Sequence, residues 1–369
     1  MPLQANIKII GMPTASEGNE GLYLDAVAKS RLVSGFPSGP FVQRLESCFR
    51  EYTGAAHAIA VNSGSAAILA ALLAAGVGPG DLVAVTTHTF VGTVNAIVLA
   101  GAQPYFLDID ELTLQPSMDS LDRALERGAR YYLPVHLYGM PATMHPGFPR
   151  ARIIEDAAQG IGCFTGGRHV GTLGIAGAFS LSPSKVISSG EGGMVVTNDS
   201  EVAAKVSIIR NHGLTAWNEH HMQGFNFRLS ELNAAYGVGQ FEQIERFLAQ
   251  RRAVADLYRS FFAGTGFAVP TPDATARCSW VKFPVVIPPG FRLAPDDLAT
   301  LLREHGVPFE RTYRAVHSFA MFQRTVAQRD RACPVAERCL ARVINLHTGP
   351  RMSAEQAESI VDDLTTIME

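Results

Sequence analysis

The chain has 369 residues, of which 47% are hydrophobic and 18% charged, and its formal net charge is -3. This length supports a large core and two domains, and the composition is ordinary for a globular enzyme. The charge balance leaves no basic surface for nucleic acid, so we expect no nucleic-acid partner. No stretch of about twenty apolar residues predicts a membrane span, and the N-terminus lacks the apolar core of a signal peptide.

The cysteines are scattered and form no CxxC pair: Cys48, Cys163, Cys278, Cys333 and Cys339. This pattern is typical of reduced thiols rather than of a disulfide framework or a zinc site. The eleven histidines show no HExxH or comparable ligand spacing. We therefore expect a cytoplasmic protein with no metal site and no membrane partner.

Short apolar runs alternate with helical stretches through the first two thirds of the chain. Strands bounded by Gly, Pro or Asp are predicted at 82–86, 104–108, 131–135, 153–156 and 194–197. Helices are predicted at 65–75 and 91–100. Continuously apolar strands separated by helices predict an α/β fold with a mostly parallel central sheet covered on both faces.

A long connecting helix is predicted from about residue 229 to 262, with Gly237 and Gly239 as weak points. It leads to a smaller C-terminal α+β unit. That unit has predicted strands at 281–287 and 307–312, a helix at 295–305, and a final helix whose Ser353 and Gln356 have capping-box spacing. We expect a large domain over residues 1–240 and a small domain over 241–369, which begins within the connecting helix.

Lys185 lies in FSLSPSKVISSGEGG, downstream of Asp156, which ends the apolar run RIIED. An amine that forms a Schiff base needs surroundings that let it lose its proton. Pyridoxal phosphate (PLP) also needs a carboxylate at its ring nitrogen and hydroxyl or N–H donors at its phosphate. A lone lysine in a Ser/Gly loop is usually a solvated charge, and a lone Asp is usually a turn former. The combination favours a PLP site.

Four weaker signals accompany this pair. Gly64 and Ser65 open a helix after the run AIAV, and a helix N-terminus attracts phosphate, although an ordinary N-cap is the commoner role. Phe90 follows a strand, where its ring can lie against a planar cofactor or pack in the core. Ser180 offers a hydroxyl from a strand end. Asn226 precedes a helix, and an asparagine in such a position is often only a structural cap that makes local backbone hydrogen bonds.

In chain order, these motifs resemble the DegT/DnrJ/EryC1/StrS group of sugar aminotransferases, which are PLP enzymes of fold type I. The matching segments span nearly all of the first 240 residues: FVQRLESCFREYTGAAHAIAVNSGSAA, THTFVGTVNAIVLAGAQPYFLDID, PVHLYG, IIEDAAQGIG, FSLSPSKVISSGEGGMVVTND, RNHG and GFNFRLSELNAA. The last third follows more loosely, through YRAVHSF. Two departures stand out. VINLHTGPRMS replaces a strand that often contains Leu-Pro, and Ser65 replaces a common threonine.

The resemblance implies that Lys185 holds PLP through a Schiff base. Asp156 then pairs with the pyridine nitrogen, Gln159 faces the 3′-oxygen, and Phe90 stacks on the ring. A nearby carboxylate favours the pyridinium by about 1–3 pK units, which agrees with the role of Asp156.

The same resemblance assigns the phosphate to Gly64, Ser65 and Ser180. Asn226 is expected to reach the phosphate from the neighbouring subunit, so the resemblance implies a homodimer with shared active sites. A phosphate dianion in a partly dry cleft needs several donors, which is consistent with contributions from two chains.

The implied reaction moves an amino group from glutamate or glutamine to a keto group of a nucleotide-linked deoxysugar. GEGG at residues 190–193 favours members that act on a 4-keto-6-deoxysugar. Arg228 and His317 are candidate contacts for an anionic substrate.

Three alternatives stay open on the sequence. A cyclitol aminotransferase acting on a keto-inositol is the nearest of them. A sugar dehydratase of the same fold is disfavoured, because those members have histidine in place of the Schiff-base lysine. A non-enzymatic regulatory protein would not need Lys185, Asp156 and Gln159 together.

Overall fold

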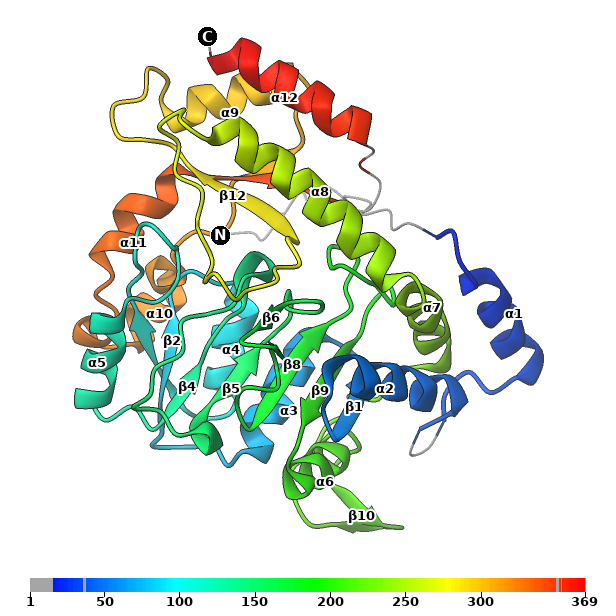
Figure 1. The fold of residues 1–369 in the computed structure, drawn as a ribbon. Helices are drawn as coiled ribbons and strands as arrows, with labels where there is room; N and C mark the ends of the chain where they lie inside the picture. The colour runs from blue at the N-terminus through cyan, green and yellow to red at the C-terminus, as the bar shows by residue number, and fades with distance from the viewer. Residues whose placement is uncertain (1–15, 36–37, 350–351, 353, 369) are drawn as a thin grey trace, which may run out of the picture.

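A computed structural model describes residues 16–35, 38–349, 352 and 354–368 (Figure 1). The cap predicted at Ser353 lies outside these residues. Within them, the elements follow the alternating order of strands and helices that the sequence predicts.

The large sheet has the strand order β1-β9-β8-β5 continued by β4-β2-β3, because parallel bridges join Tyr132 to Ile153 and Val135 to Asp156. β9 runs antiparallel to both neighbours, whereas the β8–β5, β2–β4 and β2–β3 pairs are parallel. The prediction of a mostly parallel sheet is confirmed. The strands are β1 (His57–Val61), β2 (Leu82–Thr86), β3 (Gln103–Leu107), β4 (Tyr131–Leu133), β5 (Ile154–Asp156), β8 (Ala176–Ser180) and β9 (Gly193–Thr197).

Helices cover both faces of this sheet because successive strand residues point to opposite sides. In β1, Ile59 and Val61 belong to the apolar cluster of α3 and α4, whereas Ala58 and Ala60 belong to the cluster of α2 and α7. Two of these helices, α3 and α4, match the helices predicted at 65–75 and 91–100. The covering helices are α2 (Pro40–Thr53), α3 (Gly64–Ala74), α4 (Val91–Leu99), α5 (Met118–Glu126), α6 (Ser200–Ile209) and α7 (Glu231–Phe241).

The connecting helix differs from the prediction. α7 ends at Phe241 and α8 (Ile244–Phe262) begins three residues later, so the single helix predicted from 229 to 262 is wrong. Gly239 does not break α7. A Cβ on Gly239 would lie 2.8 Å from the backbone nitrogen of Glu20, so this glycine admits α1 (Glu20–Ser30) close to α7. After the break, α8 runs to the small unit (Figure 1).

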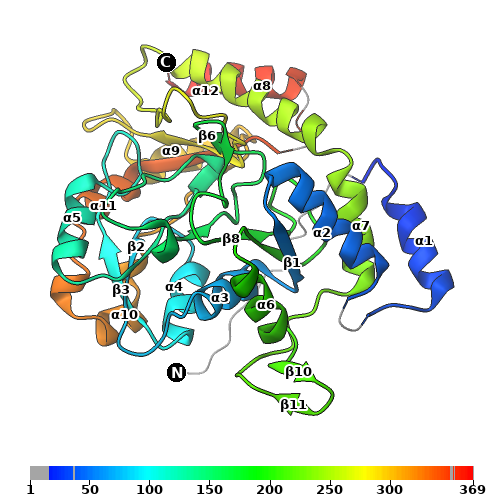
Figure 2. The ribbon, with the colours of Figure 1, turned by 60° about the horizontal axis from the view of Figure 1, so that its bottom comes forward.

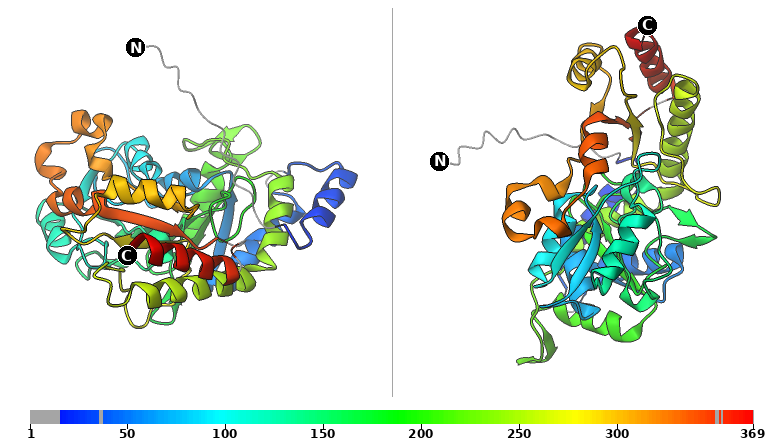
Figure 3. Two further views of the ribbon diagram at one scale, coloured as in Figure 1. Left: turned by 90° about the horizontal axis from the view of Figure 1, so that it is seen from above. Right: turned by 90° about the vertical axis from the view of Figure 1, so that its left-hand side faces the viewer.

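The small unit is built on an antiparallel sheet of order β12-β14-β13 (Figures 1 and 3). Phe283, Val285, Ile344 and Leu346 are buried with apolar residues of α8, α9 and α12. Its elements are β12 (Lys282–Val286), α9 (Pro295–Glu304), β13 (Phe309–Glu310), α10 (Ala320–Thr325), α11 (Pro334–Cys339), β14 (Val343–His347) and α12 (Ala354–Met368).

The remaining strands form two hairpins, and one of them projects beyond α6 (Figure 2). These are β6 (Phe164–Thr165) with β7 (Arg168–His169), and the projecting β10 (Leu214–Ala216) with β11 (Glu219–His220). In the described part of the chain, no helix combines the length and apolar character needed to cross a membrane.

Candidate active site

Most of the predicted site residues lie at the carboxyl ends of four strands of the large sheet, the edge at which ligands bind in open α/β sheets. β5 ends at Asp156 and β8 at Ser180, while β1 and β2 lead into the turns that carry Ser63 and Phe90. The fold therefore brings together residues from four separate motifs.

Lys185 lies in the loop between β8 and β9. Its N–H donates to Ser182 O at 3.1 Å, and its carbonyl accepts from Arg251 at 3.3 Å, so the loop backbone is fixed on both sides of the side chain. Burial lowers the pKa of Lys185 to about 8, although the nearby Asp156 carboxylate acts in the opposite direction. An amine with this pKa is partly neutral near physiological pH, as a Schiff-base lysine requires.

Asp156 is 4% exposed, and its two carboxylate oxygens are held separately. Oδ2 accepts from the Thr93 hydroxyl at 2.7 Å, and Oδ1 accepts from Ala158 N–H at 3.0 Å. Burial raises the pKa of Asp156, and these two hydrogen bonds oppose that change. No described Lys, Arg or His lies within ion-pair distance of Asp156, so this buried carboxylate fits a cationic ring nitrogen.

Thr93 is a site residue that the sequence reasoning missed. It lies on α4 one turn after Thr89, whose hydroxyl is 2.9 Å from that of Thr93. The available signal was a pair of hydroxyl residues four positions apart, one directly before Phe90 and the other three residues after it. The pair fixes the rotamer of Asp156 from the neighbouring helix.

The N-terminus of α3 forms a cradle suited to phosphate. Ser63 caps the helix by accepting from Ala66 N–H at 3.1 Å, whereas the N–H groups of Gly64 and Ser65 have no acceptor within the described chain. Ser180 lies directly across from Gly64, where a Cβ would approach the Ser180 Cβ to 2.7 Å. Free N–H groups at a helix N-terminus beside a hydroxyl fit the phosphate of PLP.

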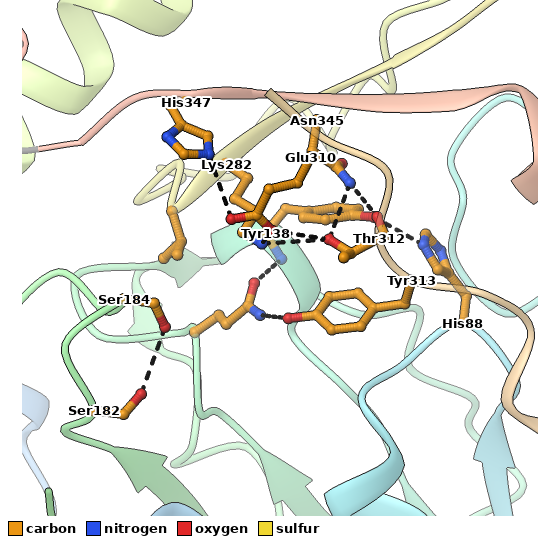
Figure 4. Close-up of polar contacts among 12 residues, drawn as sticks. His88, Tyr138, Ser182, Ser184, Lys282, Glu310, Thr312, Tyr313, Asn345 and His347 are labelled. Atoms are coloured by element: carbon orange, nitrogen blue, oxygen red, sulfur yellow. Dashed lines mark hydrogen bonds and ion pairs between the residues drawn. The ribbon is translucent and has the colours of Figure 1, made fainter. Parts of the chain in front are cut away.

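An aromatic and amide group lies between the large and small units. The Phe90 side chain is 55% exposed, and its ring centroid lies 6.2 Å from that of Tyr313. Gln159 donates to Tyr313 Oη at 3.0 Å and accepts from Tyr138 N–H at 2.7 Å (Figure 4). Sequence reasoning missed Tyr313, although it opens the YRAVHSF match. An open aromatic face beside an oriented amide suits a planar ring.

The structure leaves Asn226 and Arg228 outside this group of side chains. The Asn226 side chain is exposed, while its carbonyl accepts from Asn62 Nδ2 of the same chain at 3.1 Å. Arg228 donates to Asn211 at 2.7 Å and lines a separate cavity of about 350 Å³ with His212 and His220.

His317 is 2% exposed, and both of its ring nitrogens are engaged. Nδ1 lies 2.6 Å from Thr87 Oγ1, and Nε2 lies 2.9 Å from Glu337. This arrangement favours a structural role for His317 over direct contact with a substrate.

The chain is similar to known proteins over most of its length. The model of the DegT/DnrJ/EryC1/StrS aminotransferase family matches residues 18–365. A pleiotropic regulatory protein of Geobacillus stearothermophilus is 35% identical over 92% of both chains. A UDP-N-acetyl-3-dehydro-alpha-D-glucosamine 3-aminotransferase of Acidithiobacillus ferrooxidans is 34% identical, over 86% of this chain and 85% of its own.

A GDP-perosamine synthase of Vibrio cholerae is 31% identical, over 93% of this chain and 95% of its own. Among solved structures, DesV of S. venezuelae, determined with a ketimine intermediate, superposes with a TM-score of 0.86. It is 31% identical and covers 95% of this chain and 94% of its own. The predicted fold type I architecture is confirmed. The chain belongs to the DegT/DnrJ/EryC1/StrS aminotransferase family and is a PLP-dependent sugar aminotransferase.

Proposed function

We propose that this aminotransferase transfers the amino group of glutamate or glutamine to a keto group of a nucleotide-linked deoxysugar. The observation that carries the proposal is the convergence of Lys185, Asp156 and the α3 cradle at one edge of the sheet. These groups provide an amine of lowered pKa, a buried carboxylate with no described cation within ion-pair distance, and N–H groups that have no acceptor in the described chain. Each of these groups is suited to a different part of PLP: the amine to the aldehyde, the carboxylate to the ring nitrogen and the N–H groups to the phosphate.

Within this site we assign roles to the chain's own residues. Lys185 would hold the cofactor, and its Nζ would remove the proton from the α-carbon of the amino donor. Asp156 keeps the ring nitrogen protonated, and Thr93 keeps Asp156 oriented. Bound PLP supplies an electron sink for the negative charge left on the donor carbon.

The remaining residues would hold the cofactor in place. Gly64, Ser65 and Ser180 hold the phosphate, Phe90 covers the ring, and Gln159 faces the 3′-oxygen. We further propose that the enzyme is a cytoplasmic homodimer in which Asn226 completes the phosphate site of the partner subunit. Arg228 stays a proposed contact for an anionic substrate, since its cavity is lined by cationic and polar groups.

The sugar is chosen over a cyclitol because two of the relatives are named for nucleotide sugars or sugar products. GEGG at 190–193 favours a 4-keto-6-deoxysugar, whereas the relative from Acidithiobacillus ferrooxidans is named for amination at position 3. The test therefore has to include both keto positions.

The experiment loads the purified protein with PLP and converts it to the pyridoxamine form with glutamate or glutamine. It then offers UDP-, GDP- and TDP-linked 3-keto and 4-keto sugars beside keto-inositol. We expect one nucleotide sugar to gain an amino group, seen by mass spectrometry, and to restore the PLP absorption band. The Lys185→Ala protein serves as the matched control. If keto-inositol alone is aminated, the protein is instead a cyclitol aminotransferase.

A further inference from the structure

One face of the small sheet carries a polar cluster that points toward the Lys185 loop. Lys282 pairs across the strands with His347, and Glu310 pairs with Asn345. Because alternate residues of a strand share a face, these four side chains project from the same side, opposite the buried Leu346. Figure 4 shows them above the loop that holds Ser182 and Ser184. His347 belongs to the segment that departs from the family's Leu-Pro pattern.

Lys282 and Glu310 form an ion pair at the centre of this cluster. Lys282 Nζ also donates to Thr312 Oγ1 at 3.3 Å, and His347 Nε2 lies 3.3 Å from Glu310 Oε1. Beside His347 and Lys282, the pKa of Glu310 falls to about 2. Glu310 therefore stays negatively charged throughout the neutral pH range.

The pair is tied directly to the active site. Arg251 donates to Lys185 O at 3.3 Å and to Val281 O at 3.1 Å, so one guanidinium joins the cofactor loop to the residue before Lys282. Lys282 Nζ also lies 5.5 Å from the ring centroid of Tyr313, which accepts a hydrogen bond from Gln159.

Burial is the largest influence on the pKa of the Lys185 amine and lowers it, and four charged side chains, three on strands and one in a loop, act after it. Asp156 on β5, Glu191 before β9 and Glu310 on β13 favour the protonated amine. Lys282 on β12 disfavours it. The two members of the ion pair thus act on Lys185 in opposite senses.

We propose that Lys282 and Glu310 are a pair of positioning residues that neutralise each other on the face of the small sheet above the Lys185 loop, so that neither charge acts unbalanced on the Lys185 nitrogen. The inference rests on the proposed role of Lys185 as the PLP lysine. A buried ion pair is weak support for stability, because desolvation offsets the Coulombic attraction. Its position above the Lys185 loop favours an electrostatic role over a purely stabilising one.

The test compares the Lys282→Met, Glu310→Gln and double variants by pH titration of the visible Schiff-base band of the PLP-loaded protein. Lys282→Met leaves a negative charge unbalanced, so its midpoint moves to higher pH. Glu310→Gln leaves a positive charge unbalanced, so its midpoint moves to lower pH. We expect each shift to be roughly half a pH unit or more. The midpoint of the double variant returns close to that of the parent protein, and Lys282→Arg keeps the parent midpoint.

A second readout follows the amine without substrate turnover: the pH dependence of PLP capture by the apo-protein, which should shift in the same order. Arg44→Met is the matched control. It also breaks an ion pair, the one between Arg44 and Glu242 at 2.7 Å, but that pair is remote from the site. Lys282→Gln replaces Lys282→Met where the latter does not fold, as judged by circular dichroism.

Shifts of both single variants in one direction would overturn the inference. So would unmoved midpoints in folded, PLP-loaded variants, or a double variant that does not return to the parent value. A change confined to the KM of the sugar would replace it with direct substrate contact. Since no sugar enters either titration, an error in the proposed sugar leaves the result unchanged. A parent protein without a Schiff-base band would instead refute the role of Lys185 and, with it, the inference.

Discussion

Arg251 donates a hydrogen bond of 3.3 Å to the carbonyl of Lys185, from a helix that joins the two units of the fold. Arg251 is 2% exposed, and it has no carboxylate partner among the described residues. Its other acceptors are Val281 O and Thr348 Oγ1, both at 3.1 Å. Burial lowers its pKa to about 10. A buried cation bonded to neutral acceptors from three segments holds the lysine loop against the small sheet.

We predict that Arg251→Met lowers the free energy of unfolding by about 2–4 kcal/mol, because it leaves buried acceptors unsatisfied. It should also weaken PLP binding, since the Lys185 loop loses its anchor. Arg252→Met is the control. Arg252 bonds Cys278 O and Gly162 O, both at 3.0 Å, away from Lys185. Chemical denaturation and spectral titration with PLP measure the two effects. Equal PLP affinity in both variants would show that Arg251 does not position the loop.

Lys185→Ala should abolish transamination while the fold is retained. The side chain lies in a loop whose backbone contacts with Ser182 and Arg251 do not depend on it. PLP should still bind through its phosphate but without the Schiff-base band, and borohydride should no longer fix it to the protein. Activity at the parent rate without added amine would refute the assignment of Lys185.

Asp156→Asn should retain PLP and lose activity by about 10- to 1000-fold, because a neutral amide no longer favours the pyridinium. Thr93→Val tests the supporting hydrogen bond of 2.7 Å. Its loss raises the pKa of Asp156, so we expect a smaller loss of about 10-fold from a charged hydrogen bond worth about 1.5 kcal/mol. The measurement is the single-turnover rate with the amino donor. Parent-like rates for Asp156→Asn would make this carboxylate a structural cap.

Gly64→Ala should weaken phosphate binding, because the added Cβ would lie 2.7 Å from the Ser180 Cβ. Relief requires the cradle to open, at a cost of about 1–3 kcal/mol. Gly21→Ala is the matched control. Gly21 lies in α1 with no heavy atom within 4 Å of its Cβ position, so alanine should be neutral or stabilising there. PLP dissociation constants and thermal midpoints separate the two variants. Unchanged PLP affinity in Gly64→Ala would argue that phosphate binds elsewhere.

The sequence predicts best where the chemistry is local. Asp156 is recognisable at the end of an apolar strand and Lys185 in the short motif that follows another strand, and the sheet then brings the ends of those two strands together. The break after Phe241 was missed because the sequence places the weak points of the long helix at Gly237 and Gly239, whereas in the structure Gly239 lies within α7 and admits the close approach of α1.

Residues that act across the fold carry no such signal. Lys282 and Glu310 are far apart in sequence, and their pairing depends on the register of β12, β14 and β13. Arg251 reads as an ordinary charged residue of an amphipathic helix until its burial is known. Their partners are set by tertiary packing, which a pattern along one chain does not contain.

The last prediction concerns the subunit that Asn226 serves. Its backbone lies beside Asn62 of its own chain, two residues before Gly64, while its side chain is exposed. We predict that the side chain completes the partner's phosphate site in a homodimer. The test mixes Lys185→Ala with Asn226→Asp, each inactive alone, because the acidic side chain repels the phosphate. In a hybrid dimer one site then carries both defects and the other neither, so up to half of the hybrid's sites regain activity.

If Asn226 serves its own chain, each hybrid site keeps one defect and no activity returns. Subunit exchange is verified by native mass spectrometry, and a fully active monomer in sedimentation would also contradict the shared site.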